Sequence, residues 1–333
     1  MKSNAWWKKG FFYFLLSARI GAMKTIRRSL LLVALFIIGN IFSACRTAPS
    51  TQKQTETASL PKELQALATA GGQVDTPIAP GVGYHHLLFT NPFGDGPVSV
   101  HYLVIDWNET EKGFSLALSN CGGTRKRTSE MAAKRRALAA VNGGFYETKD
   151  PSRPVHAMKI DGNVIDSVTT NGSLALAFNK GQTPVIEPFS KELFARYDNV
   201  LNGYDVTVLK GFEPTATKAE RRKARAPRTF IGLCRTNKVM VIAVADGRSH
   251  ESIGLSGAEE CDLVRPFGCD KILNIDGGGS TTMVRRDGAD NRSIRLLNVP
   301  SDGRERRVCD ALLLLDSHSL TAADTALSQK EAF

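Results

Sequence analysis

Short apolar segments separated by polar turns recur along most of the chain and predict a strand-rich fold. The predicted strands are residues 98–107, 114–119, 139–142, 163–168, 174–178, 204–209, 229–234, 239–245, 271–275, 281–284 and 307–315. Helices are predicted at 61–68, at 128–138 with a Thr cap, and at 256–265, where Ser256 and Glu259 form a capping box before Pro266. We therefore expect one α/β domain with a mixed, strand-rich β-sheet and few helices.

A longer apolar segment near the N-terminus has the features of a secretory signal. Arg27 and Arg28 precede an apolar run over residues 30–42, and small residues lead from that run to Cys45. A basic region, an apolar stretch of this length and small residues before a cleavage point are typical of a signal peptide. A Cys in this position resembles a bacterial lipobox and predicts lipidation at Cys45. The alternative is a transmembrane anchor, but the run is shorter than the roughly 20 apolar residues that a span needs.

These features predict the organisation of the chain. The predicted parts are a lipoprotein signal peptide over residues 1–44 with Met23 as an alternative start, a lipidated Cys45 with a flexible tether to residue 83, a single domain over 84–318 and a polar tail over 319–333. Arg46 differs from the Asp that is associated with inner-membrane retention. We expect an exported protein that is lipid-anchored in the cell envelope, with the outer membrane favoured in a Gram-negative organism.

The formal net charge of +10 comes mostly from the predicted signal. Residues 1–44 contain seven Lys and Arg and no Asp or Glu, whereas the rest of the chain has 36 Lys and Arg against 33 Asp and Glu. The basic clusters at 134–136 and 221–223 have no interleaved aromatic residues, so a solvated face is favoured over a phosphate or nucleic-acid surface. We therefore expect no nucleic-acid partner.

The six cysteines show no metal-binding or redox spacing. Removal of the lipidated Cys45 leaves an odd number, and no Cys-x-x-Cys motif occurs. Cys261 and Cys269 are too far apart for a bridge across a regular helix. Most of the cysteines are expected to be buried as small apolar residues, and one disulfide among the others stays open. We expect no metal and no cofactor.

Four segments place polar residues and glycine at a strand end, or arginine at a strand start. They are Asn142-Gly143-Gly144, Pro227-Arg228-Thr229, Asp246-Gly247-Arg248 and Asp276-Gly277-Gly278-Gly279-Ser280-Thr281. A single Asn-Gly or Asp-Gly is an ordinary turn, but recurrence at strand ends is typical of a site in an α/β sheet. Together the segments supply two carboxylates, two guanidinium groups, an amide and a glycine-lined wall. This set predicts a site for a polar, anionic, carbohydrate-like ligand.

The order of these motifs makes residues 139–315 similar to the phosphodiester glycosidase family. That family is typified by the mammalian lysosomal N-acetylglucosamine-1-phosphodiester alpha-N-acetylglucosaminidase, and its bacterial members are described as exopolysaccharide-related. The matching segments are VNGGFY at 141–146, KIDG at 159–162, NGYD at 202–205, PRT at 227–229, IG at 231–232, DGR at 246–248, the helix with Glu259, DGGGST at 276–281 and NVPSDGRER at 298–306. Val299 stands in place of a commoner Arg, and Gly143 and Tyr146 stand where Ala and Phe are common.

The resemblance implies hydrolysis of a sugar-1-phosphodiester, which releases the sugar from a phosphate monoester. A phosphate monoester is a good leaving group, so a cationic clamp matters more than a strong general acid. We assign Arg228 and Arg248 to this clamp, because guanidinium binds phosphate through two points. Asp276 is the predicted nucleophile or water-activating base, with Asp246 as its partner carboxylate. The predicted substrate contacts are Asn142, Gly143, Gly277, Gly278, Gly279, Ser280 and Thr281, beside the two arginines.

Two other functions remain open at this point. One is a noncatalytic glycan-binding lipoprotein with the same pocket, and the other is a phosphodiesterase that cuts the P–O bond. The presence of both Asp246 and Asp276 argues against the first, and the lack of paired His/Asp motifs argues against the second. The expected partners are a phosphate-containing glycan or sugar-1-phosphodiester and, through the lipid, a membrane.

Four further residues lie near the motifs. His156 is expected to be a surface or core histidine rather than a pocket residue. Glu259 is expected to cap its helix rather than to catalyse. Asp302 and Arg304 either form a structural pair in a loop or line the rim of the site.

Overall fold

The computed structural model describes the folded body with several gaps. The described residues are 76–109, 113–147, 149–150, 153–167, 174–203, 206–210, 213–214, 224–236, 238–287 and 293–317, with backbone alone for 206–210 and 213–214. The predicted signal, Cys45, the helix at 61–68, the basic cluster at 221–223 and the C-terminal tail lie outside these ranges. Within the described ranges, no helix combines the length and apolarity needed to cross a membrane.

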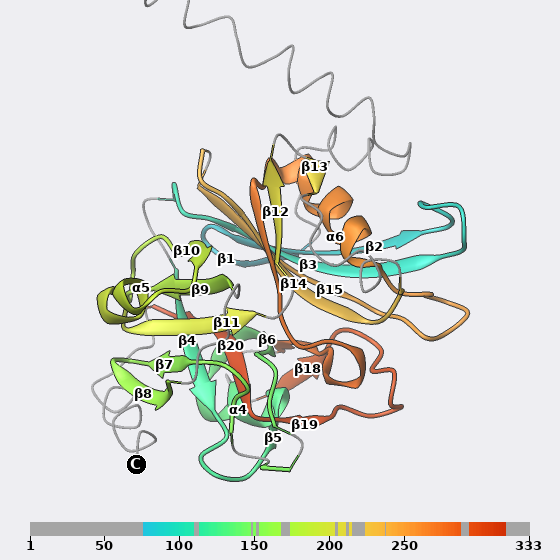
Figure 1. Cartoon of the computed structure of the whole chain (residues 1–333). Coiled ribbons are helices and arrows are strands. Elements are labelled where there is room, and N and C mark those ends of the chain that lie inside the picture. Colours follow the sequence, from blue (N-terminus) through green and yellow to red (C-terminus); the bar gives the residue numbers. More distant parts are fainter. Residues whose placement is uncertain are drawn as a thin grey trace, which may run out of the picture. The chain divides into compact units, whose positions relative to one another are not determined.

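Three sheets and a short ribbon form the architecture (Figure 1). The largest sheet contains, in spatial order, β1 (Thr76–Ala79), β2 (Val82–Phe89), β3 (Val98–Asp106), β15 (Val239–Ala245), β14 (Arg228–Cys234), β16 (Lys271–Asn274), β12 (Val206–Lys210) and β13 (Glu213–Pro214). The second contains β10 (Val185–Pro188), β9 (Leu174–Phe178), β11 (Asn199–Gly203), β7 (Met158–Ile160) and β8 (Asn163–Asp166). The third contains β18 (Ile294–Leu296), β17 (Met283–Arg286), β6 (Ala137–Asn142), β20 (Asp310–Asp316) and β4 (Phe114–Asn120). The ribbon pairs β19 (Arg307–Val308) with β5 (Lys126–Arg127).

The fold is mainly β, which corrects the predicted α/β class. The strand-rich character and the small number of helices are confirmed, but all strand pairings in the described residues are antiparallel. The connection over residues 235–238 between β14 and β15 shows why, since a link this short can join antiparallel neighbours only. A parallel sheet would need a crossover of a dozen or more residues, usually a helix, for each pair.

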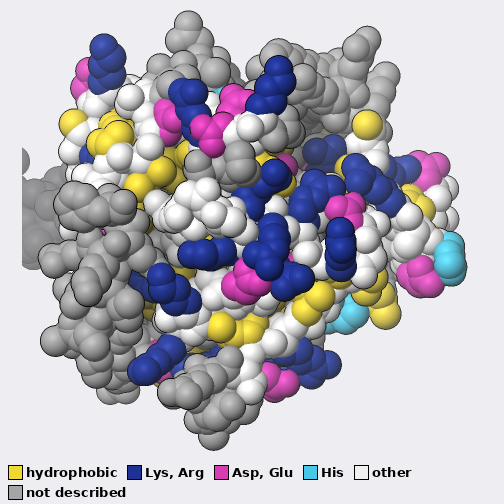
Figure 2. Space-filling model, turned by 90° about the horizontal axis from the view of Figure 1, so that it is seen from below, with side chains coloured by type: hydrophobic (Ala, Val, Ile, Leu, Met, Phe, Trp, Pro, Cys, Tyr) yellow, Lys and Arg dark blue, Asp and Glu magenta, His cyan; other side chains and the backbone are white. Residues whose placement is uncertain are grey.

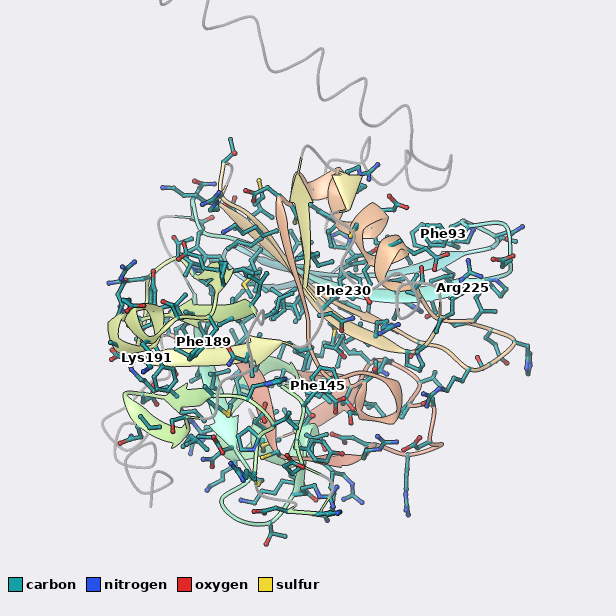
Figure 3. All side chains as sticks on the ribbon, viewed as in Figure 1. Phe93, Phe145, Phe189, Lys191, Arg225 and Phe230 are labelled. Carbon is teal, nitrogen blue, oxygen red and sulfur yellow. The ribbon has the colours of Figure 1, made fainter. Side chains whose placement is uncertain are left out.

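The described helices are short. They are α4 (Thr128–Lys134), α5 (Lys191–Arg196) and α6 (Gly257–Val264), with 3-10 turns η1 (Arg265–Phe267) and η2 (Gly278–Ser280). In α6 the predicted capping box is confirmed, since the Ser256 N–H donates to Glu259 Oε2 (2.8 Å) and the Glu259 N–H donates to Ser256 Oγ (3.4 Å). Figure 3 shows Arg225 beside α6, where it pairs with Glu259 and Asp95.

The helix predicted over 128–138 ends four residues earlier than expected, at Lys134, and its cap is different. Arg127 is the N-cap residue, and its N–H donates to Glu130 Oε2 (2.9 Å). The helix ends at Lys134 because Arg136 takes a left-handed conformation (φ 49°), and the following apolar residues form β6. The structure also shows strands that the sequence pattern did not predict, namely β1, β2, β5, β10, β11, β13 and β18. The first strand within the described residues, β1, starts at Thr76.

The main apolar core lies where the three sheets pack together. It contains Ile231 of β14, Leu176 of β9 and Val141 of β6, all nearly inaccessible to solvent. Adjacent residues point to the opposite faces, because side chains alternate along a strand. Phe230 of β14 therefore packs towards α6, whereas Ala140 of β6 packs towards α4. The strands β6, β9, β14, β15 and β20 are buried on both faces, which explains why their sequences are nearly continuous apolar runs.

The five cysteines in the described residues are all buried free thiols, as expected for small apolar side chains. Cys121 follows β4 and Cys309 precedes β20, and their sulfur atoms are 3.9 Å apart. Cys309 also separates β19 from β20, so the predicted strand over 307–315 is interrupted there.

Candidate active site

The Asp276 turn joins β16 to β17 at the meeting point of two sheets. The Asp276 N–H donates to the Gly143 carbonyl (3.2 Å), and η2 follows directly. Gly278 has φ +62°, and a Cβ there would lie 3.1 Å from Nη2 of Arg248. A Cβ on Gly279 would lie 1.9 Å from Nη2 of Arg306. A side chain at Gly278 would be strained by the left-handed backbone, and one at Gly279 would displace the Arg306 guanidinium and the Asp302 carboxylate.

The Asp276 carboxyl is half-buried in this turn. Burial raises its pKa from 3.8 to about 6, although the Ser280 hydrogen bond, the Gly277 N–H and the charge of Arg306 oppose the rise. The Gly277 N–H donates to Asp276 Oδ1 over 2.9 Å. Nη1 of Arg306 in turn donates to Ser280 Oγ (3.4 Å). Ser280 therefore lies between the carboxyl and the nearest guanidinium, in agreement with its predicted place in the site.

Asn142 positions the Asp276 turn and has no hydrogen-bonding capacity left for a ligand. Its Nδ2 donates to the carbonyls of Asp276 (2.7 Å) and Gly143 (3.3 Å). Its Oδ1 accepts from Thr229 Oγ1 (2.7 Å) and from the Thr282 N–H (3.1 Å). The side chain is fully buried. This corrects the predicted substrate contact, because two donors and two acceptor sites are the whole capacity of an amide.

Asp310, at the start of β20, is the second carboxyl of the site, and the sequence argument missed it. Its Oδ1 accepts from the Gly144 N–H (2.6 Å), and its backbone carbonyl accepts from the Gly143 N–H (2.9 Å). A Cβ on Gly143 would lie 1.7 Å from Asp310 Oδ1, so Gly143 makes room for this carboxyl. The side chain is 1% exposed, and its Oδ2 has no hydrogen-bond partner in the described residues. The sequence signal for Asp310 is its place as the first residue of an apolar strand, where a buried charge needs a reason.

Burial raises the pKa of the Asp310 carboxyl to about 8. The Gly144 N–H opposes this rise, and the negative charge of Asp276 adds to it. Near neutral pH the Asp310 carboxyl is therefore mostly protonated, whereas the Asp276 carboxyl is mostly ionised. Two carboxyl groups whose environments separate their pKa values are the arrangement that acid–base chemistry requires.

Asn202 of β11 lies next to Gly144 through its backbone and has a buried side-chain amide. Its side chain is 3% exposed, and neither its Nδ2 nor its Oδ1 has a hydrogen-bond partner in the described residues. A Cβ on Gly144 would lie 3.2 Å from the Asn202 carbonyl and 3.9 Å from Asp310 Oδ1, which places the three residues together. Tyr204 and Asp205 of the same motif lie outside the described residues. An unsatisfied buried amide is costly to a fold, so this one is a candidate ligand contact.

Arg228 makes contacts on the α6 side of β14, and its role with Arg248 as a phosphate clamp stays a prediction. The Arg228 guanidinium donates to the carbonyls of Leu255 (3.0 Å) and Ala224 (2.9 Å) and lies 3.4 Å from Glu260. These contacts bind β14 to the segment before α6. Arg248 is exposed directly after β15, and its guanidinium lies against Gly278. Arg306 lies against Gly279 instead, so Arg306 and Arg248 are the guanidinium groups that flank the turn.

Asp246 is an internal anchor, which corrects its prediction as the partner carboxylate. Its Oδ1 accepts from the Val299 N–H (2.9 Å) and from Asn298 Nδ2 (3.2 Å). Its Oδ2 accepts from Ser99 Oγ (3.2 Å) and lies 3.5 Å from Nε2 of His101. The carboxylate is nearly inaccessible, and protein groups occupy both of its oxygens.

The other residues that the sequence motifs point to differ in burial and in their partners. Thr281 is buried, and its carbonyl accepts from Asn298 (3.2 Å). His156 is buried, as expected for a core histidine, and burial lowers its pKa. Asp302 pairs with Arg306 (2.6 Å) rather than with Arg304.

A cavity of about 750 Å³ opens beside the Asp276 turn. Its lining includes Asp302, Arg304 and Arg306, together with Tyr146 from the VNGGFY segment. Asp302 and Arg304 therefore line a rim next to the site, which was one of the two alternatives. Figure 3 shows Phe145, which precedes Tyr146, between the sheets at the level of β18 and β20. Within the described residues, no group of three or more His, Cys, Asp or Glu side chains is arranged to hold a metal ion.

Two carboxyl groups, a glycine-rich turn and two arginines thus lie together on an antiparallel scaffold. Residues 135–315 match the family model described as phosphodiester glycosidase, so the chain belongs to this family, as its motifs predicted.

The individual proteins that match this chain have low sequence identity to it, between 14% and 24%. An uncharacterized SPbeta prophage-derived protein, YomE of Bacillus subtilis strain 168, is 24% identical over 216 residues, which is 61% of this chain. The aligned part spans only 32% of that relative. The catalytic domain of zebrafish N-acetylglucosamine-1-phosphodiester alpha-N-acetylglucosaminidase, auto-inhibited by its pro-peptide, is similar in fold with a TM-score of 0.57 and 19% identity. That match covers 72% of this chain and 84% of the zebrafish chain. A hypothetical protein from Synechocystis matches with a TM-score of 0.50 and 14% identity, over 72% of this chain and 64% of its own.

Proposed function

We propose that the protein is a hydrolase that cleaves the glycosidic C1–O bond of sugar-1-phosphodiesters in phosphate-linked glycans. The observation that supports this most is the Asp276 carboxyl, which is half-buried and lies in a glycine turn between two guanidinium groups. A carboxylate suits the positive charge that develops at C1, and guanidinium suits the negative charge that develops on the leaving phosphate. Membership of the phosphodiester glycosidase family supports the same reaction.

Asp276 acts in this proposal as the nucleophile or as the base that activates water. With a pKa of about 6, it is mostly ionised at neutral pH. Arg306 and Arg248 bind the phosphodiester from the two sides of the turn and stabilise the phosphate monoester as the C1–O bond breaks. That monoester leaves readily because its second pKa is about 6, as in phosphorylated side chains.

Asp310 acts as a neutral hydrogen-bond donor. Its carboxyl is mostly protonated at neutral pH, so its O–H can donate to an anionic or polar oxygen of the substrate that a carboxylate would repel. The Asn202 amide has both a donor and an acceptor, which suits a sugar hydroxyl or amide. Asn142 contributes indirectly, because it holds the backbone of Asp276.

The position of an oxygen label tests the reaction. Purified protein and an Asp276→Asn variant are incubated with a synthetic sugar-1-phosphodiester in ¹⁸O water. We expect the label at C1 of the released sugar and almost no turnover by the variant. Label in the phosphate would overturn the proposal in favour of a P–O phosphodiesterase. Absence of turnover with any glycosyl phosphodiester would favour a noncatalytic glycan-binding protein.

We further propose that the enzyme works in the cell envelope from a lipid anchor on Cys45. The basic and apolar segment before Cys45 and the polar segment after it support export and tethering. In a Gram-negative organism we favour the outer membrane. Metabolic labelling with a fatty-acid analogue tests this, with label expected on the wild type and not on a Cys45→Ser variant. An unlabelled wild type that fractionates with soluble proteins would contradict the anchor.

A further inference from the structure

The cavity beside the Asp276 turn is rich in arginine. Five arginines line it, against only two acidic side chains, Asp302 and Glu305. They are Arg125, Arg127, Arg304, Arg306 and Arg307. Figure 2 views the molecule from the end where β5 and β19 lie, and Lys and Arg side chains gather across that face. A surface of one charge sign around a cavity favours an anionic occupant.

Several of these arginines already have partners. Arg307 donates to both oxygens of Glu130 (3.1 Å each), and Arg127 donates to Glu130 Oε1 (3.1 Å). Arg306 is paired with Asp302. These pairs hold their side chains in fixed positions and leave some excess positive charge.

Arg125 and Arg304 have no carboxylate partner in the part of the chain that the structure describes. The guanidinium carbon of Arg125 lies 5.1 Å from the centre of the Tyr146 ring, which orients this guanidinium without neutralising it. The acidic Glu305 is directed elsewhere, because its carboxylate accepts from the N–H (2.8 Å) and the Oγ (2.6 Å) of Ser129. Two uncompensated guanidinium groups therefore face this cavity.

Two side chains that line the cavity, Asp302 and Arg306, also lie against Gly279 of the Asp276 turn. Arg306 lines the cavity and donates to Ser280, whose hydroxyl hydrogen-bonds to the Asp276 carboxyl. Tyr146 also lines the cavity and hydrogen-bonds to Arg306. A group attached to a phosphate that Arg306 binds at the Asp276 turn would therefore lie next to the arginine cavity.

We propose that this cavity binds a second phosphate group carried by the aglycone, so that the substrate is a glycan chain with repeated phosphodiesters. Planar guanidinium groups bind phosphate bidentately, and Arg125 and Arg304 supply them without disturbing an existing ion pair. The inference rests on the proposed function and specifies the substrate class of the same site. It concerns an anionic glycan rather than a nucleic acid, because among the described residues only Tyr146 brings an aromatic ring to the cavity, and Arg125 covers that ring.

Two matched substrates test the inference. The first is a sugar-1-phosphodiester with a methyl aglycone, and the second has a sugar aglycone that carries a further phosphodiester. We expect kcat/KM of the wild type to be about tenfold higher for the second substrate, as one charge-assisted bidentate contact allows. A double variant, Arg125→Gln with Arg304→Gln, is expected to lose this preference and to hydrolyse the methyl substrate like the wild type. The control is Arg196→Gln, an exposed arginine of α5 outside the cavity, which should keep the preference.

Equal kcat/KM of the wild type for the two substrates, or a preference that survives in the double variant, would overturn the inference. A substrate in which a uronic-acid carboxylate replaces the second phosphate gives a third arm, and an equal preference for it would overturn the assignment to phosphate. If neither substrate is hydrolysed, the proposed function fails, and calorimetric binding of the phosphate-bearing aglycone still tests the cavity. The inference is supported if the wild type binds this aglycone and the double variant binds it about tenfold more weakly. Equal affinity of the two proteins would contradict it.

Discussion

Two regions of this molecule place an aspartate before glycine at the end of an apolar strand, yet they differ in chemistry. At Asp246 both carboxylate oxygens accept hydrogen bonds from neighbouring protein groups, and the side chain ties the 298–299 segment to the largest sheet. At Asp276 the carboxyl is held by a short turn and one hydroxyl, and Asp310 beside it has an oxygen without a partner in the described residues.

The difference teaches that hydrogen-bond satisfaction, rather than sequence motif, separates a structural carboxylate from a reactive one. A satisfied carboxylate stabilises the fold, because its negative charge is fully solvated by protein donors. A buried carboxyl with few donors has a raised pKa, which costs stability and favours proton transfer near neutral pH. The following predictions separate the two regions.

Asp276→Asn is expected to have the largest effect. The amide keeps the shape of the carboxyl but removes its negative charge, so kcat on a glycosyl phosphodiester should fall on the order of 10³-fold. Steady-state kinetics measure the loss, and thermal unfolding should show an intact fold. Asp270→Asn, which changes an exposed ion pair with Arg235, serves as the control and should keep wild-type kcat. Residual activity of the Asp276 variant above about a tenth of wild type would remove Asp276 from the mechanism.

Asp246→Ala should lower the free energy of unfolding. It leaves donors from Ser99, Asn298 and Val299 without their acceptor in a buried environment, at a cost of about 3–5 kcal/mol in the free energy of unfolding. Urea denaturation measures this, with Asp270→Asn expected to change it by less than about 1 kcal/mol. A variant of wild-type stability that has lost all activity would restore Asp246 as a catalytic partner.

Asp310→Asn should stabilise the protein at neutral pH. The pKa of Asp310 is raised from 3.8 to about 8 in the fold, so the folded state keeps a proton that the unfolded state releases. This costs stability progressively as pH rises above 3.8, reaching roughly 4 kcal/mol at pH 7. The variant removes the cost, so we expect a gain of up to that size at pH 7 and little difference below pH 4. A variant that is less stable at both pH values would show that the carboxyl supports the fold.

Arg306→Gln should give a smaller effect that is visible in the pH dependence. The positive charge of Arg306 lowers the pKa of Asp276, so its removal should move the acidic limb of kcat/KM to higher pH. Arg228→Gln serves as a comparison, because its guanidinium hydrogen-bonds to backbone carbonyls before α6, and we expect the acidic limb to stay in place. Equal shifts in both variants would argue against a specific contact between Arg306 and the Asp276 turn.

Local patterns predicted the features of this fold that depend on neighbouring residues. The capping box of α6, the apolar strands β3, β14 and β15, and the Asp276 turn all follow from short segments of sequence. The direction of strand pairing does not, because an apolar strand buried on both faces has the same pattern in a parallel and an antiparallel sheet. The mainly-β class therefore required the structure.

The site residues likewise could be predicted from sequence only where they depend on neighbouring positions. Asp310 reaches Gly144 across 166 positions of sequence, and only the register of β20 against β6 brings them together. Arg228 and Arg306 are chemically identical, and what separates them is tertiary contact, with backbone carbonyls for one and the Asp276 turn for the other. Sequence patterns identified the glycine turn and Asp276, whereas the partner carboxyl and the partner arginine depended on long-range packing.

The pH dependence of kcat/KM on a glycosyl phosphodiester tests the central claim most directly. If an ionised Asp276 and a protonated Asp310 act together, the profile is bell-shaped, with limbs near the pKa values of about 6 and about 8. Asp310→Asn should remove the alkaline limb, because the variant has no proton to lose there. A profile that stays flat from about pH 5 to about pH 9, or one whose alkaline limb persists in the variant, would contradict the pairing of these two carboxyls.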